Sequence, residues 1–359
     1  MSIDYSDRSA RLLGILEIGE QEGFVISHLP DVRWLTGFSG SSGLVLLSRS
    51  GTILITDGRY SEQVKTECPG LEVLIRPGAP GNYLGPLLEH KRLRTLRIQA
   101  PEMSWAQVKT WQEEWSDIAI VPAGEELESL RVVKSEPELA LIQRALEITE
   151  QVFEEVISSL EEGISENDVA AEIDYLQRKK GASGSAFDTI VAFSENAALP
   201  HARPGPRQLK RGDSILMDFG CVVQGYHSDM TRTVSFGQAN KQFLDAYEAV
   251  HSALRHAQDG ATAGITGASL DGLARDRLTS HGFGNAFNHS LGHGVGLEIH
   301  ESPSVSVRNQ HSLVAGSIIT LEPGVYIPGQ FGIRIENMVQ LSDHGCLPLN
   351  TLSTDLIRL

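Results

Sequence analysis

Residues 214–220 read SILMDFG, and residues 317–324 read SIITLEPG. Both stretches begin as apolar runs that end in an acid, Asp218 in the first and Glu322 in the second. A short apolar run bounded by glycine or proline is typical of a buried strand. We therefore expect two related strands, each of which presents a carboxylate where its apolar part ends.

The sequence around these strands also repeats. A segment that opens at Gly163 and closes at Gly181 is followed, 101 residues later, by one that opens at Gly264 and closes at Gly282. Four further positions recur at an offset of 104 residues: Leu209, Gly212, Asp218 and Gly220 correspond to Leu313, Gly316, Glu322 and Gly324. Chance similarity is the alternative, but the matched acids argue against it. The repeat predicts a duplicated helix-and-strand unit with pseudo-twofold symmetry, which would bring the two carboxylates together.

The chain has 359 residues, which corresponds to about two domains at roughly 150 residues each. The fold class that we expect is mixed α/β (α+β), with a small domain over residues 1–130 and the repeated domain over residues 131–359. In the small domain, apolar runs predict strands at 24–26, 44–48, 53–56, 71–75 and 118–121.

Two capping boxes predict where helices begin. Ser104 with Gln107 opens a short helix, and Ser135 with Glu138 opens a long one. The stretch between the domains, residues 122–134, is interpreted as a connector.

Composition restricts the function classes. The formal net charge is −16, so non-specific binding to nucleic acid or to an anionic membrane is disfavoured. The three cysteines lie far apart in the sequence, which is typical of a reducing compartment rather than of a disulfide framework. No apolar run is long enough to span a membrane and no signal peptide is visible, so we expect a cytoplasmic protein.

Four acids stand on or beside predicted strands: Asp218, Asp229, Glu322 and Glu336. An acid on such an apolar strand is costly to bury without a partner. The simpler interpretation of any one of them is an ion pair with a neighbouring arginine, such as Arg232 or Arg334. Taken together, converging carboxylates repel one another unless a positive charge lies between them.

Residues 289–301 read HSLGHGVGLEIHE and contain His289, His293 and His300. The glycines disfavour a helix, so we expect an extended segment in which another group approaches the backbone closely. Four carboxylates and an imidazole are suited to two divalent cations, with manganese-like ions favoured over a thiolate-loving zinc site. Such a centre lowers the pKa of water and polarises a carbonyl or phosphoryl oxygen, which predicts a metal-assisted hydrolase.

These motifs resemble the pita-bread metallopeptidases, the family of methionine aminopeptidase, aminopeptidase P and prolidase. The second domain is similar to the family through MDFGCVVQGYHSDMTRTV, HSLGHGVGLEIHESP, TLEPGVY and RIENM, which occur in the family's order and spacing. The first domain resembles the creatinase/prolidase N-terminal domain through VRWLTGFSGSSG and TDGRY. The resemblance covers nearly the whole chain.

The resemblance implies a role for each candidate residue. Asp218 would chelate one metal ion, His293 and Glu322 the other, and Asp229 and Glu336 would bridge both. Glu322 would also act as general base. His201 would help to hold the substrate, and His289 and His300 would position it and stabilise the tetrahedral intermediate. Arg334 would orient Glu336 from the second shell of the site. The cofactor implied is two divalent ions, first Mn²⁺, with Co²⁺ or Zn²⁺ as alternatives.

The same resemblance implies hydrolysis of the Xaa-Pro bond at the N-terminus of peptides, with GFSGSSG at residues 37–43 favouring an aminopeptidase P-like enzyme. Prolidase, which cleaves Xaa-Pro dipeptides only, is the alternative. A metal-free creatinase-like amidohydrolase and a non-catalytic peptide-binding module are less favoured, because all five ligand positions are present. Members of the resembled family usually form dimers, which implies a homodimer here. The implied substrate is a proline-containing peptide, and we expect no nucleic-acid or membrane partner.

Overall fold

The structure is a computed structural model that describes residues 3–78, 80–123 and 125–359. The chain separates into two compact units, residues 1–131 and 132–359, each of which is described by itself. The division falls after Arg131, beside the boundary that the sequence suggests.

The first unit is built on a six-stranded mixed sheet in the order β4-β3-β2-β1-β5-β6. Its strands are β1 (Glu22–Ile26), β2 (Gly43–Ser48), β3 (Gly51–Thr56), β4 (Glu72–Ile75), β5 (Thr95–Gln99) and β6 (Ala119–Ala123). Its helices are α1 (Ser6–Leu16), α2 (Leu29–Thr36), α3 (Gln63–Glu67), α4 (Leu84–His90), α5 (Trp105–Glu114) and α6 (Glu125–Val132). The five strands predicted here are confirmed, and β2 and β3 pair as the expected hairpin.

The predicted connector at residues 122–134 is wrong, because it contains helix α6. Leu127 and Leu130 lie three residues apart on this helix and are buried, at 0% and 9% exposure. That spacing places both side chains on one helical face. In a charged stretch of eight residues, however, two leucines are a weak periodic signal, so the helix depends on its tertiary contacts.

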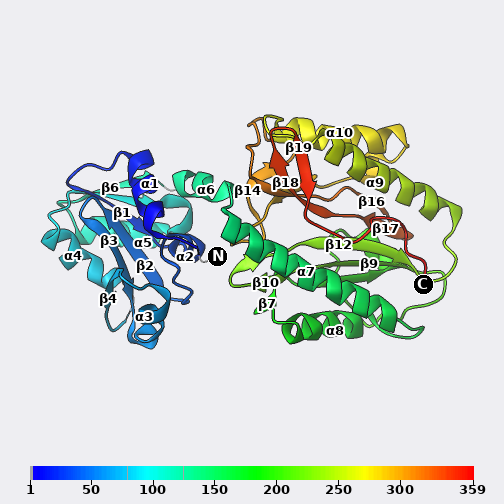
Figure 1. The fold of residues 1–359 in the computed structure, drawn as a ribbon, viewed down its shortest axis with the longest axis horizontal. Helices are drawn as coiled ribbons and strands as arrows, with labels where there is room; N and C mark the ends of the chain where they lie inside the picture. The colour runs from blue at the N-terminus through cyan, green and yellow to red at the C-terminus, as the bar shows by residue number, and fades with distance from the viewer. Residues whose placement is uncertain (1–2, 79, 124) are drawn as a thin grey trace. The chain divides into compact units, whose positions relative to one another are not determined.

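The second unit places its strands between two pairs of helices. The helices are α7 (Glu136–Ser159), α8 (Glu166–Lys179), α9 (Lys241–Gly260) and α10 (Gly267–Ser280). Figure 1 shows the pair α7–α8 and the pair α9–α10 on opposite sides of the strands of this unit. Helix α7 begins with the predicted capping box, in which Ser135 and Glu138 bond reciprocally.

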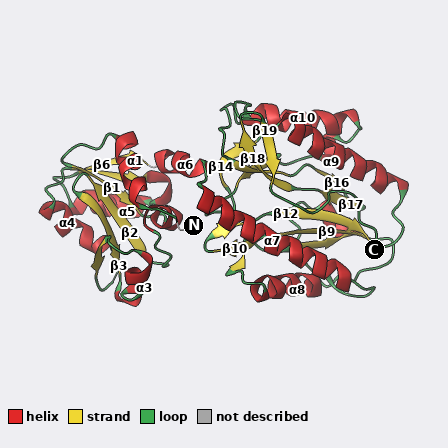
Figure 2. Cartoon of the chain, viewed as in Figure 1, coloured by secondary structure: helices red, strands yellow, loops and turns green. Residues whose placement is uncertain are grey.

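The strands of the second unit form four sheets, in the orders β12-β9-β8, β14-β13-β15-β18-β19, β16-β17 and β11-β10-β7. Their bounds are β7 (Gly184–Ser185), β8 (Ile190–Phe193), β9 (Ser214–Phe219), β10 (Cys221–Val223), β11 (Tyr226–His227), β12 (Met230–Ser235), β13 (Gly292–Gly294), β14 (Glu301–Val305), β15 (Ile318–Leu321), β16 (Gly324–Ile327), β17 (Phe331–Arg334), β18 (Asn337–Ser342) and β19 (Gly345–Pro348). Figure 2 shows these strands joined by long loops.

The two halves of this unit use the same local hydrogen bonds. In the first half the Gly163 amide donates to Leu209 O at 2.9 Å, and in the second the Gly264 amide donates to Leu313 O at 2.8 Å. Both glycines have positive φ, 97° and 90°, a conformation that favours glycine. The predicted duplication is therefore confirmed at the level of backbone contacts.

Candidate functional site

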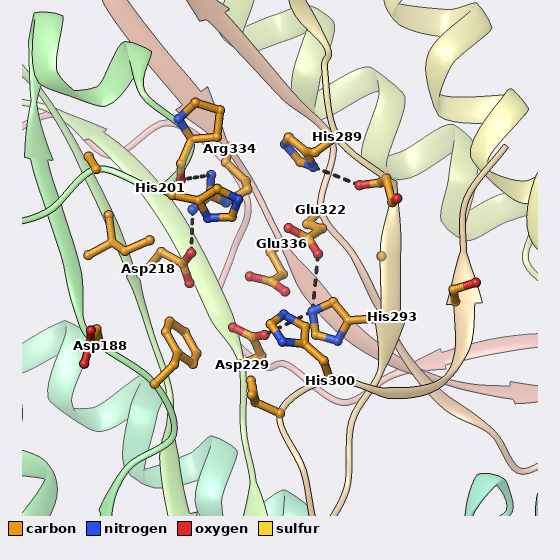
Figure 3. Close-up of a pocket in the computed structure, with 18 of the residues that line it drawn as sticks. Asp188, His201, Asp218, Asp229, His289, His293, His300, Glu322, Arg334 and Glu336 are labelled. Atoms are coloured by element: carbon orange, nitrogen blue, oxygen red, sulfur yellow. Dashed lines mark hydrogen bonds and ion pairs between the residues drawn. The ribbon is translucent and has the colours of Figure 1, made fainter. Parts of the chain in front are cut away.

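The four acids come from strand ends that lie side by side. Strands β9 and β12 pair antiparallel with Asp218 opposite Thr231, and Asp229 stands directly before β12. Glu322 follows β15, and Glu336 lies between β17 and β18. Figure 3 shows the four carboxylates converging from these elements on a shared space.

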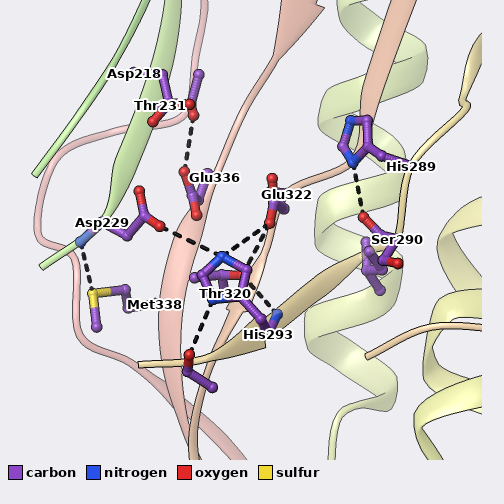
Figure 4. Close-up of polar contacts among 12 residues, drawn as sticks. Asp218, Asp229, Thr231, His289, Ser290, His293, Thr320, Glu322, Glu336 and Met338 are labelled. Carbon is purple, nitrogen blue, oxygen red and sulfur yellow. Dashed lines mark hydrogen bonds and ion pairs between the residues drawn. The ribbon is translucent and has the colours of Figure 1, made fainter. Parts of the chain in front are cut away.

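Three of these carboxylates are close enough to share a metal ion. One oxygen from each of Asp218, Asp229 and Glu336 lies within 4.8 Å of the other two. His293 extends this cluster, because its Nε2 lies 3.6 Å from Asp229 Oδ2 and 3.5 Å from Glu322 Oε1 (Figure 4). Its Nδ1 lies 3.0 Å from Gly294 O, so Nε2 is the nitrogen that faces the acids.

The electrostatics of the cluster favour a bound cation. Among the described residues, the buried atoms Asp218 Oδ1 and Glu336 Oε1 have no hydrogen-bond partner. Burial, together with the neighbouring carboxylates, raises the pKa of Asp229 and of Glu336 well above the usual range. Burial also raises the pKa of Glu322 to about 8, although Arg334 opposes the shift. Oxygen-rich ligands with unmet acceptors fit a hard divalent cation.

Arg334 contacts two of the acids in different ways. Its guanidinium pairs with Asp218, and its Nη1 donates to Tyr326 Oη at 2.6 Å. Its Nε donates to Thr231 Oγ1 at 3.1 Å, and Thr231 in turn donates to Glu336 Oε2 at 2.8 Å. Arg334 therefore reaches Glu336 through Thr231, because its own nitrogens are occupied elsewhere.

The ion-pair interpretation of the acids holds for Asp218, whose partner is Arg334. It does not hold for Arg232. That guanidinium donates to Asn337 Oδ1 at 3.0 Å and to backbone carbonyls, including that of Thr231. Neither arginine forms an ion pair with Asp229 in the described part of the chain, although the charge of Arg334 opposes the rise in the pKa of Asp229. The arrangement therefore differs from a simple set of arginine–carboxylate pairs.

The remaining candidate histidines line the same cavity, which has a volume of about 550 Å³. The rings of His300 and His293 are 4.3 Å apart, and His289 Nε2 lies 2.8 Å from Tyr326 Oη. Burial lowers the pKa of His289 and of His293 to about 4, and it also lowers the pKa of His300. These imidazoles are therefore neutral at pH 7. His201 reaches the same cavity from the loop after the 3₁₀ helix at Ser194–Ala198.

Glycines let the histidine-bearing strand β13 fit between its neighbours. A Cβ on Gly292 would lie 2.0 Å from Thr320 O, and one on Gly294 would lie 2.3 Å from Ser302 O. No side chain fits so close to a backbone oxygen. The predicted close approach to the backbone is confirmed, and it places His293, between the two glycines, over the acids.

Sequence reasoning missed several residues of this site. Tyr326 lies within the quoted motif TLEPGVY but was assigned no role, although it contacts both Arg334 and His289. Arg203 and Asp188 also line the cavity. Arg203 lies two positions after His201, which is the one signal in the sequence that could have pointed to it.

Comparison with known proteins decides the family. Residues 140–343 match metallopeptidase family M24, and residues 8–133 match the creatinase/prolidase N-terminal domain. The chain belongs to metallopeptidase family M24. Membership of this family implies divalent metal ions, and the donor set described above fits them.

Several solved structures share the architecture of this M24 member. An X-Pro aminopeptidase from Thermotoga maritima is 36% identical, with a TM-score of 0.91 over 98% of this chain and 100% of its own. An Xaa-Pro dipeptidase from Bacillus anthracis is 32% identical, with a TM-score of 0.94 over 99% and 100%. Among curated relatives, an Xaa-Pro dipeptidase of Pyrococcus horikoshii is 31% identical over 98% of this chain and 99% of the relative.

These neighbours confirm the predicted fold class, a creatinase-like N-terminal domain followed by a pita-bread domain with an internal repeat. The M24 family also confirms the prediction of a metallopeptidase. In the described residues of this family member, no helix combines the length and the apolarity that crossing a membrane requires.

Proposed function

We propose that this M24 metallopeptidase hydrolyses the Xaa-Pro bond at the N-terminus of short peptides. The observation that carries the proposal is one cavity that collects five ligand-type side chains and three further histidines. The named relatives support the bond type, since both the dipeptidases and the aminopeptidase among them are named for Xaa-Pro substrates.

We infer that two divalent cations, first Mn²⁺, bind in this cavity. Asp218 would hold one ion, His293 and Glu322 the other, and Asp229 with Glu336 would contact both. The unpartnered oxygens of Asp218 and Glu336 support this assignment. When bound, such ions lower the pKa of water and polarise the carbonyl group of the scissile bond.

The protein side chains would divide the remaining work. Glu322 would accept a proton from the attacking water and return it to the leaving proline nitrogen. Neutral His300 would donate a hydrogen bond to the oxygen that becomes negative in the transition state. The Nδ1 of neutral His289 donates to Ser290 O at 2.8 Å, so its Nε2 accepts from Tyr326 Oη, and this imidazole would position the substrate instead. His201 would hold the substrate from the opposite half of the repeat.

Arg203 favours a second, narrower candidate, a dipeptidase. Its side chain is exposed and lines the cavity, and within the described residues it makes no hydrogen bond or ion pair. An Xaa-Pro dipeptide carries its free carboxylate next to the scissile bond. Since the cavity is otherwise rich in acids, an available guanidinium is a suitable partner for that carboxylate.

Two properties of the whole protein are also proposals, a cytoplasmic location and a homodimer. The first is supported by the separated cysteines, all of which are free, and the second by the family resemblance alone. The molar mass of the protein, measured by light scattering as it elutes from a size-exclusion column, tests the dimer. A mass near 39 kDa, that of one chain, would contradict it.

The substrate proposal is tested with three peptides at fixed Mn²⁺: an Xaa-Pro dipeptide, an Xaa-Pro-Xaa tripeptide and the Xaa-Ala-Xaa analogue. We expect cleavage of the proline peptides and little of the analogue. Cleavage of the tripeptide indicates an aminopeptidase, and cleavage of the dipeptide alone indicates a prolidase. Equal cleavage of the alanine analogue would contradict the proposal.

A further inference from the structure

Two fully buried carboxylates lie outside the metal cluster, one in each half of the repeat. Glu166 is the first residue of α8 and Asp271 is the fifth residue of α10, and both are 0% exposed. A buried carboxylate is costly unless hydrogen-bond donors surround it. The donors around these two identify what each carboxylate holds in place.

Glu166 holds the loop that carries His201. Its Oε1 accepts from the Phe193 amide at 2.8 Å, and its Oε2 accepts from the Gly205 amide at 3.0 Å. The side chain of Asn196 donates to both oxygens, at 2.9 and 3.1 Å. These donors lie on either side of His201, so a single carboxylate fixes both ends of its loop.

Asp271 holds the segment that carries His289. Its Oδ1 accepts from the Leu291 amide at 3.0 Å. It also forms a two-point ion pair with Arg275, at 2.8 and 3.0 Å. Arg275 in turn donates to the backbone oxygens of Phe287 and His289, both at 3.0 Å. The carboxylate and its arginine thus hold residues 287–291 from both sides.

We propose that Glu166 and Asp271 are positioning residues for His201 and His289, respectively, which would aim the two imidazoles at the substrate from opposite halves of the repeat. The inference rests on the proposed function, in which these histidines act on the peptide. Each half of the repeat uses a buried carboxylate to hold a histidine-bearing segment, but the two carboxylates are not equivalent positions. The residue that corresponds to Glu166 at the offset of 101 is Gly267, not Asp271. Neither carboxylate belongs to the cluster around Asp229.

Double-mutant cycles separate positioning from general structural support. Glu166→Gln puts an amide NH₂ against one of the two backbone N–H donors, and Asp271→Asn breaks the pair with Arg275. Each change should lower kcat/KM by about 100-fold, the usual cost of a misplaced reacting group. Glu166→Gln should add nothing to His201→Ala, and Asp271→Asn should add nothing to His289→Ala.

The crossed pairs are the internal control of the cycles. In these double variants, the decrease in kcat/KM should equal the product of the two single decreases. The crossed pairs are Glu166→Gln with His289→Ala, and Asp271→Asn with His201→Ala. The proposal would be overturned if the decreases in kcat/KM also multiplied in the matched pairs, Glu166 with His201 and Asp271 with His289. An unchanged rate in either carboxylate variant, or in either histidine variant, would do the same.

Amide hydrogen exchange tests the inference without any activity measurement. Glu166→Gln should raise exchange over residues 193–205 only, and Asp271→Asn over residues 287–291 only, with metal content unchanged. Unchanged or delocalised exchange would contradict the positioning role. A wild-type protein that cleaves no Xaa-Pro peptide would instead contradict the proposed function, so the two failures are distinguishable.

Milder variants cover the case in which a buried substitution prevents folding. Asn196→Ala removes only the side-chain donor to Glu166, and Arg275→Lys removes the forked contact to the backbone of Phe287 and His289. Both should reproduce the local rise in exchange to a smaller extent. The matched control is Glu155→Gln, whose carboxylate pairs at 2.8 Å with Lys180 and is 47% exposed. It should change neither exchange nor kcat/KM.

Discussion

Thr231 stands between a cation and an anion of the site, and its hydroxyl is the link between them. It accepts a hydrogen bond from Arg334 and donates one to Glu336. A hydroxyl can do both at once, which neither valine nor alanine can. At the residue scale, the orientation of Glu336 therefore depends on an uncharged neighbour as much as on the arginine.

We expect Thr231→Val to weaken metal affinity by about 10- to 100-fold, the range that is typical of residues that orient metal ligands. Thr233→Val is the matched control. It changes the same face of the same strand, but among the described residues the Thr233 hydroxyl hydrogen-bonds to the backbone of Arg334 and to no carboxylate. Titration of metal into both metal-free variants measures the difference, and equal affinities would contradict the role of Thr231.

Arg203 makes a second prediction at this scale. If its guanidinium binds the free carboxylate of a dipeptide, Arg203→Ala should raise KM for the Xaa-Pro acid by about 10- to 100-fold, as expected for a charged hydrogen bond. The corresponding Xaa-Pro amide should be unaffected. Steady-state kinetics on the two substrates provides the comparison, and equal effects on acid and amide would exclude this contact.

Strand β13 shows how an element positions the site. It is paired on both sides, with β14 and β15, and it is only three residues long. Its glycines remove the side chains that would hold those neighbours apart, so the imidazole of His293 projects from a tightly enclosed backbone. The element, rather than a loop, sets the distance from His293 to the acids.

We expect Gly292→Ala to lower the free energy of unfolding by about 1–3 kcal/mol and to abolish metal binding, because its Cβ would meet backbone atoms that cannot move away. Gly272→Ala in α10 is the control. Nothing lies within 4 Å of that Cβ, and alanine should stabilise the helix by roughly 0.5–1 kcal/mol. Denaturant unfolding measures both changes, and a stable, metal-binding Gly292→Ala variant would contradict the packing argument.

The elements differ in how far they could be predicted from sequence. Strand ends with acids, the repeat and the capping box at Ser135 are local patterns, and the structure contains them all. Helix α6 depends on the packing of Leu127 and Leu130 against other parts of the chain. Two leucines in a charged stretch do not predict that packing. The contact of Arg334 with Tyr326 and the contacts of Glu166 and Asp271 join different segments of the chain, and for that reason they were missed.

In the metal-free state, the buried carboxyl groups make the stability of the whole molecule depend on pH. Asp229, Glu322 and Glu336 are buried together, and burial raises the pKa of each. A carboxyl group with a raised pKa in the folded state favours folding while it is protonated. That contribution is present below the pKa of the unfolded chain and is lost as pH rises through the folded value, which is about 8 for Glu322.

We therefore expect the metal-free protein to become less stable as pH rises from about 6.5 towards 8. Below pH 6.5 the lowered pKa of His289 and of His293 acts in the opposite direction, because the unfolded chain then binds the additional protons. Saturating metal should remove this loss, because metal binding requires the deprotonated ligands. Thermal unfolding across this pH range, with and without Mn²⁺, tests the prediction. A metal-free protein whose stability rises with pH over this window would show that the carboxylates are compensated by other means.

The central claim is that this cavity is a metal centre that hydrolyses Xaa-Pro bonds. The most direct measurement is the rate of Xaa-Pro peptide hydrolysis by the exhaustively chelated protein as Mn²⁺ is added back, beside the Asp229→Ala variant. The account predicts no activity without metal, recovery with Mn²⁺ in the wild type and none in the variant. Activity that survives chelation, or full recovery by Asp229→Ala, would contradict it.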